Sequence, residues 1–301
     1  MSTALPQALS AARVDWLPAE ASARRYARLT RPTAVDRPSA IAMVFARGTP
    51  PAEVSRVERA TRLLADAGLP VPTIFAVDPE ELWILQEDLG NVTLAAARVR
   101  GDGVASAYSE AVQLLDRLEG LNLPTSPRPP LNASRLRQEL NVFAAAALGL
   151  SEGPGPDLAA DFDRIVDAAL ADGSRLCHRD YHSRNLLIHE GRVRVVDHQD
   201  ALAGPIAYDR VSLAYDPYVD LSDSIRDRIA GSGDAVGATA VQRLAKAIGT
   251  FAEKGGAWRP FIGPAARQAR RLLPQVGAPC PLIDLAFASL AAGADTARAA
   301  T

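Results

Sequence analysis

Residues 177–185 read Cys-His-Arg-Asp-Tyr-His-Ser-Arg-Asn, and this stretch decides the fold. It contains the triplet His178-Arg179-Asp180, and Asn185 follows the aspartate five residues later. A short hairpin pattern comes next, and a second aspartate, Asp197, follows it directly. A histidine and an aspartate at this spacing carry little information alone. The triplet, the asparagine, the hairpin and the second aspartate together form a specific pattern.

The hairpin predicts which of these polar side chains lie together. Two β-like runs, 186–188 and 192–196, flank Glu190-Gly191, which indicates a turn. Paired residue numbers then sum to about 381, so that Asn185 faces position 196 and Asp197 faces position 184. An amide and a carboxylate at this distance can share one cation. Because glutamate is poor at positive φ, a bulged turn with a register shifted by one residue is the alternative.

Asp180, Asn185 and Asp197 have the residue types and spacing of the catalytic loop of kinases. We expect Asp180 to position and deprotonate an acceptor hydroxyl. We expect Asn185 and Asp197 to hold Mg²⁺ on the phosphates of ATP. The base role is thereby filled, so His178 is predicted to pin the loop, and Cys177 to be a core residue.

Composition sets the broad class. The chain has 301 residues, of which 48% are hydrophobic and 23% charged, and this length is as compatible with two lobes around a cleft as with one block. A net charge of −2 lacks the excess basicity that nucleic-acid or membrane binding requires. With two cysteines, no signal-like start and no long apolar run, we expect a cytoplasmic protein without a disulfide framework.

The chain divides into a β-rich part and a helical part near residue 88. Residues 1–88 contain proline-broken extended pieces over 14–50, including a buried strand at 40–46, a helix over 52–67, and strands over 73–77 and 82–85. Residues 89–301 are rich in helical patterns. These patterns lie over 104–118, 135–148, 158–171, 238–251, 265–273 and 282–292.

Four stretches carry a resemblance to the aminoglycoside phosphotransferase and choline kinase superfamily, which is related to protein kinases. They are residues 20–28, 86–90, 178–209 and 241–251. The first and last are more specifically similar to bacterial anomeric sugar kinases of peptidoglycan recycling, which phosphorylate C1 of N-acetylmuramate and N-acetylglucosamine. The resemblance implies an α+β, bilobal protein-kinase-like fold, with a β-rich N-lobe (1–88) and a larger helical C-lobe (89–301).

The resemblance also implies where ATP binds and what braces the loop. ATP is expected beneath the hinge formed by Gln86, Glu87 and Asp88. Asp209 matches the position that braces the catalytic loop from behind. His178 is expected to support the loop in the same way.

The phosphate-binding groups depart from the protein-kinase pattern. The first glycine is Gly48, so the glycine-rich loop is missing, and the candidate strand 41–46 has no lysine. Only Lys246 and Lys254 are lysines in the whole chain. We expect Ser22 and Arg24 to contact the nucleotide phosphates instead, with Arg25 and Arg28 as further candidates. A solvated arginine-rich turn is the alternative.

A first-lobe glutamate could pair with an arginine in place of the missing lysine. Glu53 and Glu58 are the candidates on helix 52–67, and Arg47 is the candidate partner. Two glutamates exposed to solvent are the equal alternative.

The acceptor is expected near residues 215–223, which contain three aspartates and two tyrosines. We predict that Asp216 contacts the substrate. Acidic, aromatic pockets favour cations, so this run points to a neutral or cationic acceptor rather than to carboxylated muramate. The tryptophan that the resemblance leads us to expect around 139–147 is absent, which predicts a reduced surface for stacking a sugar.

The sequence therefore predicts an ATP- and Mg²⁺-dependent phosphotransferase that acts on a small-molecule hydroxyl. C1 of an N-acetylated amino sugar is the favoured position. An aminoglycoside, choline or other small-alcohol kinase is the first alternative. A catalytically silent nucleotide-binding protein is the second.

Overall fold

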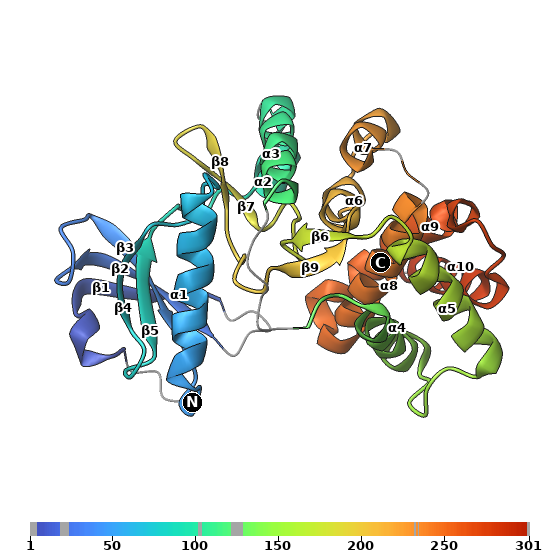
Figure 1. Cartoon of the computed structure of the whole chain (residues 1–301), viewed down its shortest axis with the longest axis horizontal. Helices are drawn as coiled ribbons and strands as arrows, with labels where there is room; N and C mark the ends of the chain where they lie inside the picture. The colour runs from blue at the N-terminus through green and yellow to red at the C-terminus, as the bar shows by residue number, and fades with distance from the viewer. Residues whose placement is uncertain are drawn as a thin grey trace.

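A computed structural model describes residues 5–18, 24–101, 104–121, 129–231, 233 and 235–299. Its first part is a five-stranded antiparallel sheet in the order β1-β2-β3-β5-β4, with one helix, α1, packed on it (Figure 1). The elements are β1 (Ala11–Trp16), β2 (Arg25–Pro32), β3 (Ser39–Val44), α1 (Pro51–Asp66), β4 (Ile74–Asp78) and β5 (Trp83–Glu87). A short 3₁₀ turn (Gln7–Leu9) precedes β1.

Alternation along β3 explains how the sheet is covered. Ala40 and Ala42 pack into one apolar cluster, whereas Met43 belongs to another that includes Val54 and Val57 of α1. Successive side chains of a strand point to opposite faces, so one face receives the helix. Pro51 at the start of α1 and Gly68 just after it bound this helix.

The rest of the chain is mainly helical and forms the other end of the molecule (Figure 1). Helix α8 is its centre, because it packs against α4, α5, α6 and α9. The helices are α2 (Leu94–Arg100), α3 (Val104–Glu119), α4 (Ala133–Leu148), α5 (Pro156–Leu170), α6 (Tyr208–Ala214), α7 (Asp223–Ala230), α8 (Ala235–Lys254), α9 (Ile262–Leu272) and α10 (Pro281–Ala299). Two 3₁₀ segments, Gly256–Phe261 and Leu273–Val276, flank α9.

Glycine permits the closest approach within this helical part. A Cβ added at Gly249 of α8 would lie 2.9 Å from the Cα of Phe143 in α4. The two helix backbones therefore meet at a point where only glycine fits without a shift. This contact fixes how α8 lies against the core.

Four short strands flank the segments that contain the predicted catalytic residues Asp180, Asn185 and Asp197. β6 (Ser174–Cys177) pairs with β9 (Leu202–Pro205), and β7 (Leu186–His189) pairs with β8 (Arg192–Val195). Leu186 lies opposite Val195, so the paired numbers sum to 381 and the predicted hairpin register is confirmed. Glu190 and Gly191 form the two-residue turn, both at positive φ, which excludes the bulged alternative.

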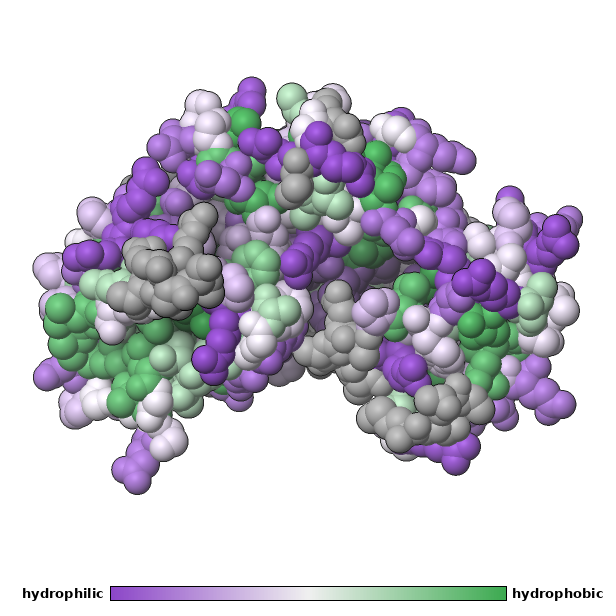
Figure 2. Space-filling view, turned by 180° about the vertical axis from the view of Figure 1, so that it is seen from behind, coloured by the Kyte–Doolittle hydropathy of each residue, from purple (hydrophilic) through white to green (hydrophobic). Residues whose placement is uncertain are grey.

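The predicted fold class is confirmed: a β-rich N-lobe precedes a larger, mainly helical C-lobe. Seen from behind, the surface is mostly hydrophilic, with apolar patches, and it is hollowed between the two parts (Figure 2). Among the described residues, none of the helices combines the length and apolarity that crossing a membrane requires.

Candidate active site

The catalytic loop between β6 and β7 is held in an unusual backbone conformation. Arg179 has φ of 79° and Asp197, just after β8, has φ of 60°. Non-glycine residues adopt this left-handed region at a cost, so the surroundings must fix it. Asp209, at the start of α6, does so by accepting hydrogen bonds from the backbone amides of His178 (2.5 Å) and Arg179 (2.9 Å). Burial raises the pKa of Asp209 to about 6.

His178 and Arg179 add side-chain contacts to the same loop. His178 is buried, and its Nε2 lies 3.0 Å from the carbonyl oxygen of Val196. The guanidinium of Arg179 lies 3.5 Å from a carboxylate oxygen of Glu139 in α4. Asp209 and His178 therefore contact the loop backbone, and neither lines the two cavities of the site.

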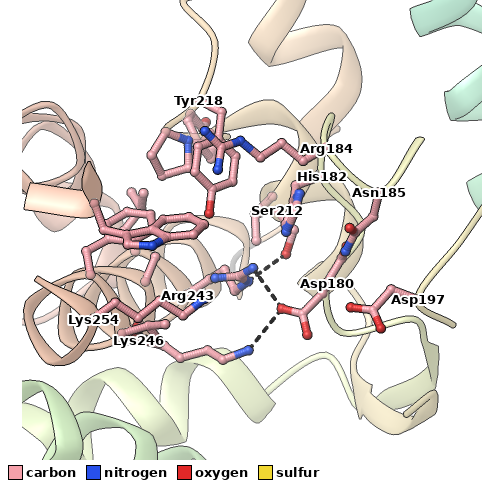
Figure 3. A pocket seen from close by; sticks show the side chains of 18 residues that line it. Asp180, His182, Arg184, Asn185, Asp197, Ser212, Tyr218, Arg243, Lys246 and Lys254 are labelled. Atoms are coloured by element: carbon pink, nitrogen blue, oxygen red, sulfur yellow. Dashed lines mark hydrogen bonds and ion pairs between the residues drawn. The ribbon is translucent and has the colours of Figure 1, made fainter. Parts of the chain in front are cut away.

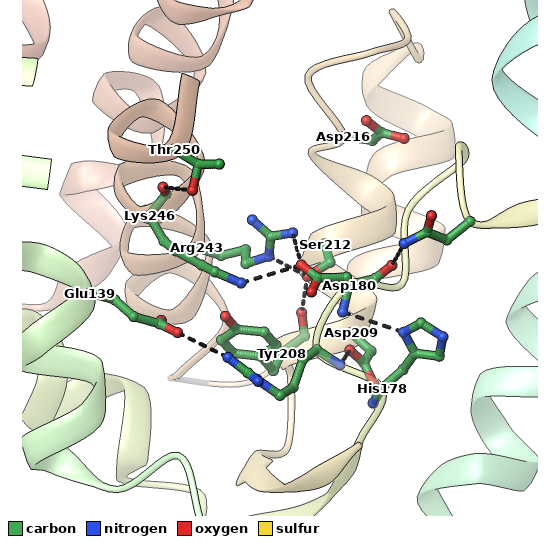
Figure 4. Close-up of polar contacts among 12 residues, drawn as sticks. Glu139, His178, Asp180, Tyr208, Asp209, Ser212, Asp216, Arg243, Lys246 and Thr250 are labelled. Carbon is green, nitrogen blue, oxygen red and sulfur yellow. Dashed lines mark hydrogen bonds and ion pairs between the residues drawn. The ribbon is translucent and has the colours of Figure 1, made fainter. Parts of the chain in front are cut away.

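Asp180 faces two cations from helix α8. Its Oδ1 lies 3.2 Å from the Arg243 guanidinium and 3.3 Å from Lys246 Nζ (Figure 4). Arg243 is itself oriented by Ser212 of α6, whose hydroxyl accepts a hydrogen bond of 3.0 Å from Arg243 Nε. Burial alone would raise the pKa of Asp180, but the charges of Lys246 and Arg243 outweigh it and hold this pKa well below its usual range. These two cations therefore favour the carboxylate form of Asp180.

Asn185 and Asp197 line the same cavity as Asp180 (Figure 3). The side-chain amide nitrogen of Asn185 donates a hydrogen bond to the backbone carbonyl oxygen of Asp180 at 3.0 Å. The Oδ1 of Asn185 is the acceptor atom of the same side chain. Burial raises the pKa of Asp197, the hydrogen bond from Gln199 lowers it, and the neighbouring Asp180 raises it. Two carboxylates and an amide oxygen in one cavity wall form a donor set whose negative charge a hard cation would neutralise.

This donor set fits Mg²⁺ better than a metal held by protein ligands alone. The described residues contain no cluster of three histidine, cysteine, aspartate or glutamate side chains that could hold a metal by themselves. Mg²⁺ commonly takes one or two protein carboxylates and completes its shell with water and substrate phosphates. The Asn185 and Asp197 pair matches that requirement.

Two cavities meet at this wall. The larger one, of about 790 Å³, lies between the sheet and the catalytic loop, and the smaller one, of about 230 Å³, lies between the loop and α8. Five residues line both cavities: Asp180, Arg184, Asn185, Asp197 and Lys254. A group transferred from one cavity to the other would pass the Asp180 carboxylate.

The three predicted hinge residues line the larger cavity, but two of their side chains are already engaged. Asp88 forms two hydrogen bonds with Arg28, of 2.7 and 2.9 Å, and Glu87 pairs with Arg194 of β8 at 2.6 Å. Burial raises the pKa of both carboxyls, but the arginines, together with hydrogen bonds from Thr73 to Glu87 and from Gly90 to Asp88, outweigh burial and leave both pKa values lowered. The carboxylates of Glu87 and Asp88 are therefore held by arginines and stabilise the hinge. Gln86 is the remaining hinge residue that lines the cavity.

Arg24 lines the larger cavity, and its guanidinium lies 3.4 Å from Asp200 of the C-lobe. Arg56 of α1 contacts the same Asp200 at 3.4 Å and pairs with Glu53 at 2.6 Å. Glu53 thus pairs with an arginine of its own helix, whereas the candidate Arg47 is exposed. Ser22, the other predicted phosphate contact, lies outside the described residues.

Glu58 fits the alternative of a glutamate on the surface of the helix. Its carboxylate lies 2.9 Å from Arg62, one helical turn further along α1. This pair is on the helix surface and takes no part in the cavity.

The prediction that Asp216 contacts the acceptor is corrected by its position. Its side chain is buried and does not line the smaller cavity. One carboxylate oxygen accepts from the Ser183 amide (2.8 Å) and hydroxyl, and the other accepts from the Tyr218 amide (2.9 Å). Asp220 and Asp223 pair with Arg226 on the surface. The three aspartates of this run therefore bind backbone amides or pair with Arg226, and none of them lines the smaller cavity.

The smaller cavity is basic and aromatic instead. Its walls carry Arg184, Arg243, Lys246 and Lys254, together with Tyr218, Phe251 and Trp258. Phe251 and Trp258 stack at 5.8 Å with an angle of 14° between their planes. Burial lowers the pKa of His182, in the same wall, to about 3, so this histidine is neutral at physiological pH. Aromatic side chains from outside 139–147 therefore provide a stacking surface in this cavity.

Sequence reasoning assigned no role to Arg243, Lys246, Arg184 or Lys254. Arg243 and Lys246 lie one helical turn apart on α8, more than 60 residues from Asp180, and no local pattern links them to the loop. The available signal was composition: the chain has only two lysines, and both line this cavity.

The fold and the site define a class, the kinase-like phosphotransferases of small molecules. The choline kinase LicA from Streptococcus pneumoniae is similar with a TM-score of 0.59 and 13% identity, over 88% of this chain and 93% of that one. The aminoglycoside phosphotransferase APH(4)-Ia, in complex with ADP and hygromycin B, has a TM-score of 0.58 and 15% identity, over 89% and 94%. At these identities the likeness concerns the fold.

Residues 16–245 match the sequence profile of the phosphotransferase enzyme family, and the chain belongs to this family. It is 34% identical over 208 residues to an N-acetylmuramate/N-acetylglucosamine kinase of Pseudomonas aeruginosa, covering 66% of this chain and 59% of that protein. It is 33% identical over 165 residues to the kinase of the same name from Pseudomonas putida, covering 52% and 48%. The chain thus spans about half the length of these curated relatives.

Proposed function

We propose that this protein transfers the γ-phosphoryl group of ATP to a hydroxyl of a small sugar, namely C1 of an N-acetylated amino sugar such as N-acetylmuramate or N-acetylglucosamine. The observation that carries this proposal is the position of Asp180, in the wall shared by the larger and the smaller cavity. The names of the relatives supply the sugar class.

The two lobes have different roles in the proposed reaction. Residues 1–88 and the hinge form most of the larger cavity, in which the nucleotide binds, with Gln86 and Arg24 facing it. Residues 89–301 supply the catalytic loop and the acceptor cavity. Asn185 and Asp197 would hold Mg²⁺, which when bound neutralises charge on the nucleotide phosphates.

Asp180 accepts the proton of the attacking hydroxyl. Lys246 and Arg243 keep it ionised and fix its orientation, so the acceptor oxygen meets a carboxylate already in its reactive form. The smaller cavity, at about 230 Å³, lies below the usual range of roughly 300–1,000 Å³ for drug-sized ligands, which favours a monosaccharide.

An aminoglycoside or choline acceptor fits less well. Both are cations, and the smaller cavity has four basic side chains against the carboxylates of Asp180 and Asp197. The acidic run that favoured a cationic acceptor lies outside this cavity.

The test is ATP consumption with Mg²⁺ and each of four acceptors, N-acetylmuramate, N-acetylglucosamine, kanamycin and choline, with NMR of the product. A 1-phosphate of an amino sugar is the expected product. Turnover of kanamycin or choline alone would transfer the proposal to those acceptors, and binding of ATP without any turnover would replace it with a silent nucleotide-binding role.

A further inference from the structure

Arg184, which is half-buried, and Lys254, which is exposed, differ from several paired cations of this protein. Arg28, Arg194 and Arg210 each face a carboxylate at 2.7 Å or less. Among the described residues, neither Arg184 nor Lys254 has an acidic partner or a hydrogen bond; both contact aromatic rings instead. Two positive charges at the site thus have no acidic partner among the described side chains.

The rings place these charges on the acceptor side. The Arg184 guanidinium lies 3.9 Å from the centre of the Tyr218 ring and 5.0 Å from that of Trp258, and Lys254 Nζ lies 4.2 Å from the same Trp258 ring. Tyr218 and Trp258 line the smaller cavity and not the larger one. A guanidinium stacked on a ring keeps its edge free for an anion.

The other charges of the cavity balance one another. Arg243 and Lys246 both face Asp180, and Asp197 belongs to the metal pair. Asp216, which also lies near Tyr218, uses both of its oxygens on Ser183 and Tyr218. The surplus positive charge therefore belongs to Arg184 and Lys254, beside an aromatic wall suited to a sugar ring (Figure 3).

From this we infer that Arg184 and Lys254 bind a carboxylate of the acceptor, so that the protein selects carboxylated N-acetylmuramate over neutral N-acetylglucosamine. This inference rests on the proposed function. It also reverses the expectation from the acidic run, which pointed away from muramate.

The experiment compares kcat/KM for both sugars, and for the amide of N-acetylmuramate, in the wild type and in Arg184→Gln and Lys254→Gln. We expect each variant to lose about 10- to 100-fold with N-acetylmuramate, the range for a lost hydrogen bond to a charged group, and less than about 2-fold with the two neutral sugars. Arg192→Gln is the matched control, since Arg192 is 75% exposed on the β7–β8 hairpin.

Equal losses for all three sugars would overturn the inference, because the two cations would then serve the transferred phosphoryl group, which every acceptor shares. That result would leave the proposed function standing. Turnover of neither amino sugar by the wild type would instead overturn the proposed function, and this inference with it.

Discussion

Lys246 Nζ lies 3.3 Å from Asp180 Oδ1, although the two residues are 66 positions apart in the chain. Helix α8 thus supplies a positive charge to the carboxylate that the catalytic loop presents. Ionisation of Asp180 is a property of two elements together, and it can be tested through either of them.

Lys246→Met should make the activity sensitive to acid. Asp180 must be ionised to accept a proton, and its lowered pKa keeps it so far below neutral pH. Loss of the lysine raises this pKa, so the acidic limb of the profile of kcat against pH should move to higher pH. Arg243 still faces Asp180 and limits the shift. An unmoved limb in the variant would contradict this role for Lys246.

Asp180→Asn should abolish turnover and spare nucleotide binding. The amide cannot accept the proton, and a positioned general base contributes about 10²- to 10⁴-fold in rate. Steady-state kinetics and calorimetric titration with ATP check the two parts. Asp284→Asn, which removes an exposed carboxylate paired with Arg270, is the control. Full activity of Asp180→Asn would remove the mechanism.

Asp88→Asn should loosen the hinge. Asp88 is 8% exposed and accepts two hydrogen bonds from Arg28 of β2. Replacing a partner of a charged hydrogen bond costs about 1–3 kcal/mol, and KM for ATP should rise because the hinge lines the nucleotide cavity. The surface pair of Asp15 with Arg13 gives the control, Asp15→Asn, which should cost less than about 1 kcal/mol. Equal stability losses in the two variants would count against the hinge role.

His198 should make the stability depend on pH. It is buried beside Thr61 of α1, at 2.8 Å, and burial lowers its pKa to about 3. The unfolded chain takes up a proton below about pH 6.5 while the folded chain does not, so stability falls as the pH drops from 6.5 towards 3.

The loss approaches about 1.4 kcal/mol per pH unit for this one group. Urea unfolding of the wild type and of His198→Gln at pH 7.5 and 5.5 measures it. The variant should show the shallower dependence on pH, and an identical dependence in both proteins would refute the assignment.

Gly249→Ala should displace α8. The added methyl group would meet the backbone of Phe143 at 2.9 Å, and such overpacking costs about 1–3 kcal/mol. Because Lys246 lies almost one turn earlier on the same helix, kcat should fall as well. Gly293→Ala in α10, where an added Cβ would meet no described atom within 4 Å, is the control and should be neutral or slightly stabilising. A Gly249→Ala protein as stable and active as the control would contradict the close-contact reading.

Local patterns predicted the elements well. The turn at Glu190 and Gly191 fixed a hairpin register that the structure reproduces, and helical spacing placed α1 and α8 within three residues at each end. The short elements α2, α6 and α7 were missed, because seven or eight residues give too little periodicity to recognise.

The site was predictable only where it is continuous in sequence. Asp180, Asn185 and Asp197 lie on one loop and hairpin, so their spacing places them together. Arg243 and Lys246 reach Asp180 through tertiary packing of α8. The expectation for Asp216 failed for a different reason. Composition shows that a carboxylate is present, but not that backbone amides already donate hydrogen bonds to it.

Because both lysines line the smaller cavity, the chain is unusually simple to label there. Apart from an α-amino group, an amine-reactive reagent meets only Lys246 and Lys254 in this sequence. Lys246 is 17% exposed and paired with Asp180, whereas Lys254 is exposed. Mass spectrometry of modified peptides, with and without an acceptor bound, therefore reports occupancy of the cavity directly in the unmutated protein.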